Sequence, residues 1–181
     1  MPNSRKITRL IIHHSEGQND TFNSIKNWQT TKDDPDTEAK EGMGWSHVTY
    51  HYVIEKDGKI HIGQTEKKSS GGTKASSKDS LEVCLCGDFD SQTPSKEAIQ
   101  RLRLLLTNWC KTYNIVPSPS TIVGHKDVQA KKGNNDNRCP GMNLHSRIPH
   151  LRMEIASDLA KWHLEKAQKK ALKKLRAREI K

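Results

Sequence analysis

Two histidines and one cysteine are the residues of this 181-residue sequence best suited, by type and position, to bind a metal ion. His13 ends the apolar run "LIIH", and His125 ends the run "TIVGH". Both runs are predicted strands, whose ends are where sites are assembled on a rigid frame. Cys139 lies in "NRCPG", a loop that its proline and glycine make tight. Two imidazoles and a thiolate are good zinc ligands, and three protein ligands leave the fourth position open for water.

The distances along the chain leave other interpretations of these residues open. The three lie far apart in sequence, so Cys139 could instead be a buried free thiol, and either histidine could be a solvated or hydrogen-bonded side chain. His14 directly follows His13 in the same predicted strand. Because side chains alternate between the two faces of a strand, His13 and His14 cannot both point at one site.

Four stretches of sequence read as strands that could position these residues. Residues 7–13 form an apolar run, and "SLEVCLCGDF" and "STIVGH" are further buried runs. The stretch "HVTYHYVIEKDGKIHIGQ" reads as a hairpin around a Lys-Asp-Gly turn. Apolar spacing predicts helices over residues 21–30, from Thr93-Pro94 to about residue 112, and from about residue 146 onward.

The order of these elements predicts the fold class. Strands and helices are intermixed without regular alternation, which indicates a mixed α/β domain with one central mixed sheet flanked by helices. The stretch "KDVQAKKGNNDNRCPG" reads as an irregular polar loop. We therefore predict a single domain over residues 1–160 and a basic amphipathic helical tail over residues 161–181.

The tail is predicted from a change in the apolar stripe of the last helix. The stripe moves by about half a turn near His163, and lysines then occupy the face that the core residues used. Residues 161–181 hold nine Lys or Arg and two Glu, a net charge of +7 out of +10 for the chain. This charge favours an anionic partner, which could be outer-membrane lipid, lipopolysaccharide or nucleic acid. The tail lacks interleaved aromatics and a DNA-binding motif, so we expect no specific nucleic acid; a merely solvated helix is the alternative.

The N-terminal stretch "MPNSRKITRLII" contains no apolar segment long enough for a signal peptide. We therefore expect synthesis in the cytoplasm without export by the general secretory route. In that compartment disulfides are rare, so Cys84, Cys86 and Cys110 are interpreted as small buried apolar residues.

Four motifs in order carry a resemblance to a known family: "IIHHSEG", "GWSHVTYHYVIEKDGKIHIGQ", "SLEVCLCGDF" and "VGHKDV…CPG". Over about residues 7–147 the chain resembles the zinc-dependent N-acetylmuramoyl-L-alanine amidases of the type-2 amidase superfamily. That superfamily includes phage endolysins and animal peptidoglycan recognition proteins. The resemblance implies that His13, His125 and Cys139 bind Zn²⁺. By strand alternation His14 then faces away from the metal, toward a polar neighbour or solvent.

The resemblance also implies two catalytic residues. The family's catalytic tyrosine falls on Tyr50, in "TYHY". Many members carry a lysine, or a threonine in recognition-type members, two residues before the third ligand, where this chain has Asn137. Asparagine can donate a hydrogen bond but carries no charge, so Lys131, Lys132 or Arg138 of the same loop could supply a cation instead.

The activity implied is hydrolysis of the amide between N-acetylmuramic acid and L-alanine of peptidoglycan by zinc-activated water. The size, the missing signal peptide and the cationic tail resemble a phage or prophage endolysin. Such an enzyme is a monomer that waits in the cytoplasm and reaches the wall through a permeabilised inner membrane. The alternatives are a bacterial wall-remodelling or recycling amidase and a noncatalytic peptidoglycan receptor. Receptors of this family typically lack the cysteine ligand that this chain retains.

Overall fold

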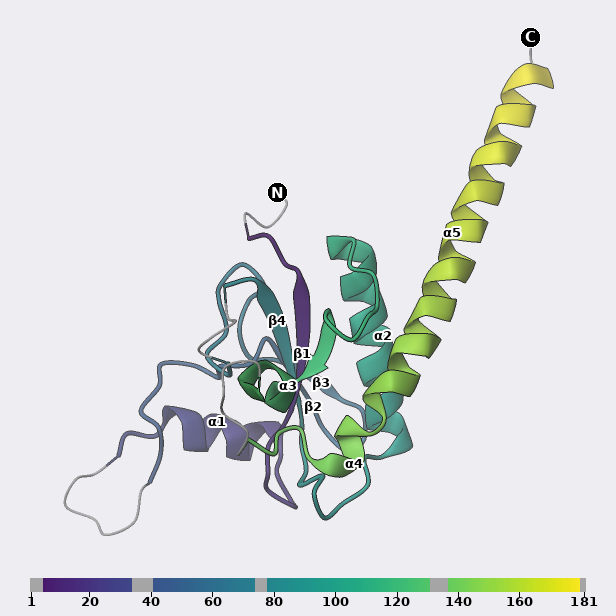
Figure 1. Ribbon diagram of the computed structural model, residues 1–181. Coiled ribbons are helices and arrows are strands. Elements are labelled where there is room, and N and C mark those ends of the chain that lie inside the picture. Colours follow the sequence, from purple (N-terminus) through teal and green to yellow (C-terminus); the bar gives the residue numbers. More distant parts are fainter. Residues whose placement is uncertain (1–4, 34–40, 74–77, 131–136, 180–181) are drawn as a thin grey trace.

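The computed structural model describes residues 5–33, 41–73, 78–130 and 137–179. They form a mixed α/β domain with one five-stranded sheet and helices on both of its faces (Figure 1). The predicted fold class is therefore confirmed. The strands are β1 (Arg9–His14), β2 (Tyr52–Ile54), β3 (Ile60–Ile62), β4 (Ser80–Leu85) and β5 (Ile122–Gly124).

The strand order is β3-β2-β4-β1-β5, and β1, β2, β4 and β5 run parallel to one another. Only β3 is antiparallel, because it is the second arm of the predicted hairpin with β2. The register pairs His13 of β1 with Cys84 of β4, and Ile12 of β1 with Gly124 of β5. The carboxyl ends of the parallel strands therefore meet at one edge of the sheet, which is where open α/β sheets bind ligands.

Two helices cover one face of the sheet. They are α2 (Lys96–Tyr113) and α5 (Ile148–Glu179), and the short α4 (Met142–His145) precedes α5. Leu10 and Ile12 of β1 belong to the core on this face, together with Leu102 of α2 and Ile155 of α5. Each of these side chains is fully buried, so this face holds the main hydrophobic core.

The opposite face is covered by α1 (Phe22–Thr30) and α3 (His125–Ala130). Ile11 packs with Val128 of α3, and Ile25 of α1 packs with a smaller cluster that includes Cys84. Because Ile11 and Ile12 lie on opposite faces, His13 belongs to the α1 and α3 face, and His14 belongs to the main-core face.

Helix α1 begins where the sequence predicted. The Thr21 side chain accepts a hydrogen bond from the Ser24 N–H at 3.2 Å, and the Ser24 side chain accepts one from the Thr21 N–H at 2.9 Å. This reciprocal capping satisfies two backbone donors that a helix start leaves free. Of the apolar residues at helical spacing in this helix, Ile25 is buried, whereas Trp28 is 47% exposed.

The start of one helix and the nature of one connecting stretch differ from the prediction. The cap of α2 is Ser95, whose side chain accepts the Ala98 N–H, so Thr93 and Pro94 precede the helix. Serine and threonine are both favoured cap residues, and the sequence prediction chose the threonine. The stretch after His125 is the helix α3 rather than an irregular loop, because Val128 buries itself against the sheet. A six-residue helix is too short to show a periodic pattern.

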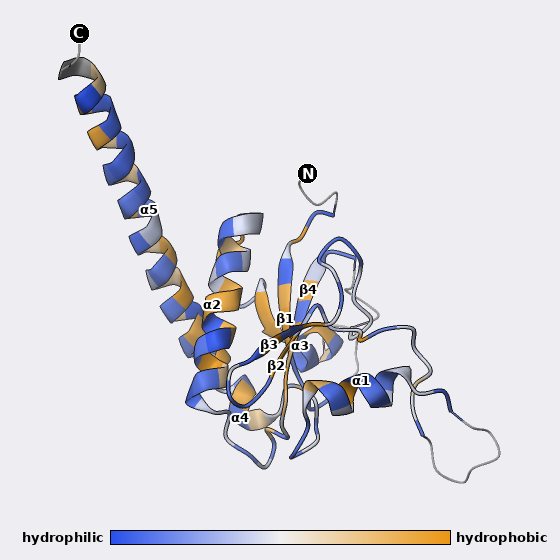
Figure 2. Cartoon of the chain, turned by 180° about the vertical axis from the view of Figure 1, so that it is seen from behind, coloured by the Kyte–Doolittle hydropathy of each residue, from blue (hydrophilic) through white to orange (hydrophobic). Residues whose placement is uncertain are grey.

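Helix α5 is continuous over 32 residues and extends well beyond the body of the domain (Figure 1). Its first part docks through Ile148, Leu151 and Ile155, whereas residues 163–177 are all exposed. Figure 2 shows the outer part as mostly hydrophilic with a few apolar positions. The division into residues 1–160 and 161–181 stays a prediction. None of the helices in the described ranges combines the length and the apolar character needed to cross a membrane.

Candidate metal centre

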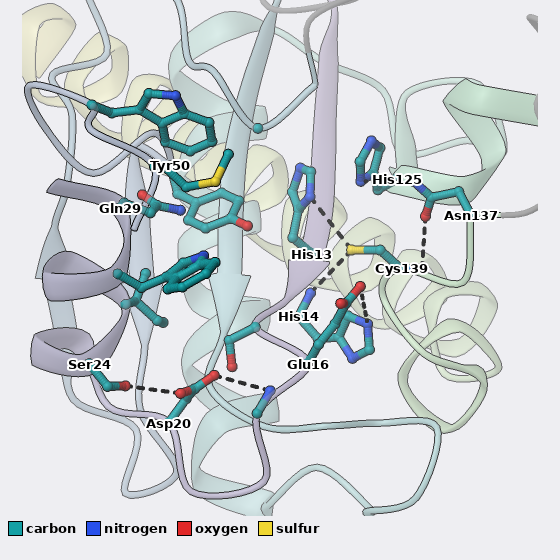
Figure 3. A pocket seen from close by; sticks show the side chains of 17 residues that line it. His13, His14, Glu16, Asp20, Ser24, Gln29, Tyr50, His125, Asn137 and Cys139 are labelled. Carbon is teal, nitrogen blue, oxygen red and sulfur yellow. Dashed lines mark hydrogen bonds and ion pairs between the residues drawn. The ribbon is translucent and has the colours of Figure 1, made fainter. Parts of the chain in front are cut away.

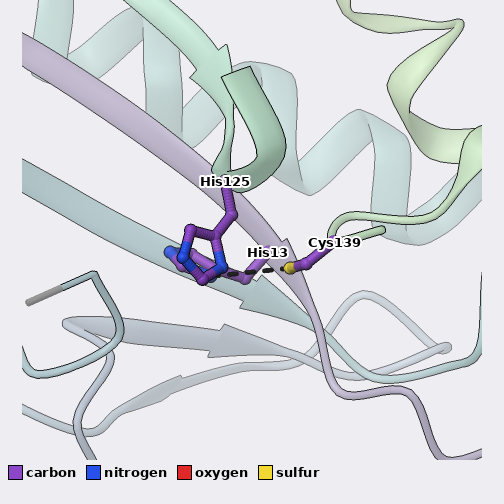
Figure 4. Close-up of side chains that lie close together, drawn as sticks. All are labelled: His13, His125 and Cys139. Carbon is purple, nitrogen blue, oxygen red and sulfur yellow. Dashed lines mark hydrogen bonds between the residues drawn. The ribbon is translucent and has the colours of Figure 1, made fainter. Parts of the chain in front are cut away.

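The structure brings the three predicted ligands together. His13 comes from the end of β1, His125 is the first residue of α3, and Cys139 lies in the loop before α4. One donor atom from each residue lies within 4.8 Å of the others (Figure 4). His13 and Cys139 are buried, and His125 is half-buried at the open side. Residues that are distant in sequence therefore form one compact donor set.

Two glycines allow the Cys139 loop to reach the sheet edge. A Cβ on Gly124 would lie 2.7 Å from Cδ of Pro140, so the glycine at the end of β5 leaves room for this loop. Gly141 has a φ of 81°, and a Cβ there would lie 2.4 Å from the Phe89 carbonyl carbon. The Lys126 N–H donates to the Cys139 carbonyl at 2.7 Å. The glycines of "VGH" and "CPG" therefore have steric roles in assembling the site.

The donor set fits zinc. Nδ1 of His13 lies 3.6 Å from Sγ of Cys139. Tetrahedral zinc, with Zn–N of about 2.0–2.1 Å and Zn–S of about 2.3 Å, places nitrogen and sulfur about 3.5–3.6 Å apart. The backbone N–H of His14 also points at Sγ, at 3.4 Å, and such a donor stabilises a thiolate. Two imidazoles, one thiolate and an open side match the ligand set of a catalytic zinc ion.

The charges around the site favour a cation at His13. Burial alone lowers the pKa of His13, but Cys139 and the carboxylate of Glu82 outweigh it and raise the pKa to about 10. Burial, followed by the neighbouring His13, lowers the pKa of His125 to about 4. The same pocket thus attracts one positive charge while keeping the second imidazole neutral and able to donate its lone pair.

The second nitrogen of His13 contacts a carboxylate that sequence analysis did not identify. Nε2 lies 3.2 Å from Oε2 of Glu82 and 3.4 Å from Oγ1 of Thr73. Glu82 belongs to β4 and is fully buried. A signal for it was present in the sequence, because a carboxylate inside the apolar run "SLEVCLC" must find a partner when buried.

Tyr50 lies beside the candidate ligands. Its ring centroid is 5.1 Å from that of His13, and Figure 3 shows its hydroxyl directed toward the His13 side of the pocket. Burial, followed by the neighbouring Cys84, raises the pKa of Tyr50 well above its ordinary value. The hydroxyl therefore keeps its proton at neutral pH and can donate a hydrogen bond. The next residue, His51, is buried and does not line this pocket.

Asn137 supports the loop that carries Cys139. Its Oδ1 accepts the Cys139 N–H at 2.8 Å, and its Nδ2 lies 3.5 Å from Nδ1 of His125. Lys131 and Lys132, the alternative cations, lie outside the described residues. Arg138 is exposed and lines an adjoining hollow rather than the main pocket.

His14 does not belong to the donor set, but it is more enclosed than a solvent-facing residue. Its side chain is 1% exposed, and its Nδ1 accepts the Phe89 N–H at 3.1 Å. Its Nε2 lies 3.7 Å from the carboxylate of Glu16. Of the two alternatives, a polar neighbour and solvent, the structure shows the first.

The donor set lies in a pocket of about 470 Å³ (Figure 3). The opposite wall is apolar and includes Trp28 of α1 together with Met43 and Trp45 of the following segment. His47, two residues after Trp45, is exposed and does not line the pocket. A polar floor that carries the candidate metal ligands and faces an aromatic wall suits an elongated substrate with both polar and apolar surfaces.

Known proteins are similar to this chain in sequence and in fold. Peptidoglycan-recognition protein SD of Drosophila melanogaster is 24% identical over 150 residues, which are 78% of this chain and 72% of that protein. The endolysin of Enterobacteria phage T3 is 31% identical over 109 residues, 56% of this chain and 64% of the endolysin. The solved structure of the N-acetylmuramoyl-L-alanine amidase LysC from Clostridium intestinale URNW has the same fold. Its TM-score is 0.60 at 22% identity, over 86% of this chain and 87% of that one.

A family model supplies the broader match. Residues 3–142 match the model for N-acetylmuramoyl-L-alanine amidases. That range contains every residue of the donor set together with Tyr50 and Asn137. Because the match covers far more than half of the chain, the protein belongs to the N-acetylmuramoyl-L-alanine amidase family and is a peptidoglycan amidase, as its four ordered motifs predicted.

Proposed function

We propose that this protein hydrolyses the amide between the lactyl group of N-acetylmuramic acid and L-alanine of the stem peptide, using zinc held by His13, His125 and Cys139. One observation carries the proposal: three donors of a catalytic zinc set meet on the floor of a pocket that also contains the Tyr50 hydroxyl. The open side at half-buried His125 gives the substrate access to this floor.

The chemistry follows from the donor set. Zinc bound there would supply Lewis-acid polarisation of the scissile carbonyl and a water acidic enough to act as nucleophile near neutral pH. The protein's contribution is to hold three ligands on a rigid sheet edge, so that little reorganisation is needed during reaction. The apolar wall of Trp28, Met43 and Trp45 would hold the glycan and peptide against that edge.

Tyr50 is the proposed donor to the negative charge that develops on the carbonyl oxygen. Its raised pKa keeps the hydroxyl protonated, and its place beside His13 puts it next to the reacting amide. Asn137 stands where many members carry a cation, and we propose that its amide orients His125 and the Cys139 loop. It provides hydrogen bonds there and no charge.

A lytic role is the biological setting that we propose. The family relatives include phage endolysins that are about 30% identical over 109 residues. In this setting the monomeric enzyme is made in the cytoplasm and reaches the wall after the inner membrane is permeabilised. We propose that residues 161–181 engage the anionic outer membrane or lipopolysaccharide. The exposure of Leu164, Leu172 and Leu175, each above 55%, on a lysine-rich helix supports this role.

Metal analysis tests the proposal. Protein purified without chelators should hold about one zinc ion per chain, lose wall-solubilising activity when the metal is stripped, and regain it when zinc is restored. Purified protein with no stoichiometric zinc, or with full activity after stripping, would contradict the proposed site. Binding of peptidoglycan without release of any product would favour a receptor, as the likeness to peptidoglycan-recognition protein SD suggests.

A further inference from the structure

The carboxylate of Glu82 is directed at the rear of the candidate metal centre. Its side chain lies on the same face of β4 as that of Cys84, two residues later, and Cys84 pairs with His13 in the sheet. Oε2 lies 3.2 Å from Nε2 of His13. Among the described residues, this oxygen has no hydrogen-bond partner besides that nitrogen.

The surroundings of Glu82 hold it in this position and keep water away. The Glu82 backbone N–H donates to Nδ1 of His51 at 3.0 Å, and Nε2 of His51 lies 3.1 Å from the Lys68 carbonyl oxygen. On the pocket side the carboxylate is covered by Gly72. A Cβ at that position would lie 2.4 Å from Oε2 of Glu82 and 2.9 Å from a ring carbon of Tyr50.

Burial makes an isolated carboxylate unfavourable, so Glu82 must be paired with a donor or a positive charge. Neutral histidine carries one N–H. Because Nδ1 of His13 faces Sγ of Cys139, a metal at that nitrogen requires the proton on Nε2, and Glu82 is the acceptor placed there. The charges also balance, since one divalent cation, one thiolate and one carboxylate sum to zero in the enclosed site.

We propose that Glu82 is a positioning residue that fixes His13 in its Nε2–H tautomer and thereby sets the zinc affinity of the site. This inference rests on the proposed zinc site. Thr73 is the competing acceptor, because its Oγ1 lies 3.4 Å from the same nitrogen. A charged acceptor at 3.2 Å is the stronger of the two, so loss of the Glu82 charge should matter more than loss of the Thr73 hydroxyl.

Chelator competition on the full-length protein tests the proposal. Glu82→Gln keeps the size of the side chain and removes its charge, and we expect zinc binding to weaken about 10- to 100-fold. Thr73→Val should weaken it less. Thr107→Val, which alters a buried polar residue of α2 outside the pocket, should leave zinc affinity unchanged.

The outcomes separate this inference from the proposed function. If wild type binds zinc tightly and Glu82→Gln binds it within threefold, the role of Glu82 is wrong and the zinc site stands. If wild type itself binds no zinc, both fail.

A measurement on the wild type alone covers the case in which Glu82→Gln does not fold. In zinc-loaded protein with ¹⁵N-labelled histidine, NMR should show a protonated Nε2 on His13, protected from exchange with solvent. A His13 ring whose Nε2 carries no proton would overturn the proposal.

Discussion

His13 and His14 show how strand geometry separates two identical side chains. Alternation places His13 on the α1 and α3 face, where it meets Cys139, whereas His14 turns to the Phe89 backbone. The backbone of His14 still contributes, because its N–H points at the candidate thiolate. Replacing the His13 side chain is therefore expected to have a different effect from replacing the His14 side chain.

His13→Ala should lose stoichiometric zinc and all wall-solubilising activity, because one of three ligands is removed. His14→Ala should keep about one zinc per chain and retain activity, although loss of a buried side chain should lower its thermal midpoint. Metal content and activity of the two purified variants provide the test. A His14→Ala protein as metal-free and inactive as His13→Ala would overturn the face assignment.

Tyr50→Phe should remove a hydrogen-bond donor without disturbing the metal. We expect activity to fall by about 10²–10³, as for loss of one donor to a developing oxyanion, while zinc content stays at the wild-type level. Turnover of soluble peptidoglycan fragments measures the activity, and elemental analysis measures the zinc content. Activity within a few fold of wild type would show that Tyr50 is a wall residue only.

At the scale of elements, the sequence predicted the sheet and its flanking helices well. The hairpin, the two long buried strands and the helix over residues 21–30 follow from local patterns, and the structure confirms them. The short helix α3 and the Ser95 cap were missed because six residues show no period and because Thr93 and Ser95 are both residue types that favour helix caps.

The candidate site likewise contains residues that the sequence predicted and contacts that it could not predict. Family motifs located His13, His125, Cys139 and Tyr50 within the chain. The contact between His13 and Glu82 spans 69 positions, and it exists only because β1 and β4 are parallel neighbours. Single-sequence patterns carry no information on such a pairing. Trp28 is likewise exposed because it lines the pocket wall, and helical spacing alone does not reveal this position.

An ion-pair cluster connects α2 to α5 and gives a pH-dependent prediction. The Arg103 guanidinium donates to both oxygens of Asp158 at 2.7 and 2.8 Å and to Glu154 at 3.2 Å. These Arg103 hydrogen bonds lower the pKa of Asp158 below its ordinary value. Because the groups are partly exposed, Asp158→Asn should reduce the free energy of unfolding by only ~0.5–1 kcal/mol at pH 7.

The sign of the pH effect follows from the direction of the shift. A carboxylate with a lowered pKa in the folded protein contributes its stability above its unfolded pKa of about 3.9 and loses it as pH falls further. Denaturant unfolding should thus show a larger difference in the free energy of unfolding between wild type and variant at pH 7 than near pH 3. Glu165→Gln, on the exposed part of the same helix, serves as the control without effect. A constant difference at both values would mean that Asp158 acts through packing.

At the scale of the whole molecule, the outer half of α5 is set apart from the catalytic body. The docked part ends near Trp162, whose ring is contacted by Lys111 of α2 and by Lys166 one turn further on. Beyond it, residues 163–177 are exposed, and none of them lines the pocket. The tail and the site should therefore be separable by deletion.

A protein that lacks residues 164–181 should retain activity on purified peptidoglycan and lose activity on intact Gram-negative cells. The reason is that the removed lysines and leucines would act on the membrane rather than on the amide bond. Parallel assays on the two substrates make the comparison. An equal loss in both would show that the tail belongs to the catalytic fold.

The bond that is cleaved tests the account most directly, and mass spectrometry of peptidoglycan digested by the purified protein identifies it. The account predicts stem peptides with new free L-alanine amino termini and glycan strands that carry intact lactyl groups. New reducing sugar ends with peptides still attached would contradict it and would identify a glycosidase instead.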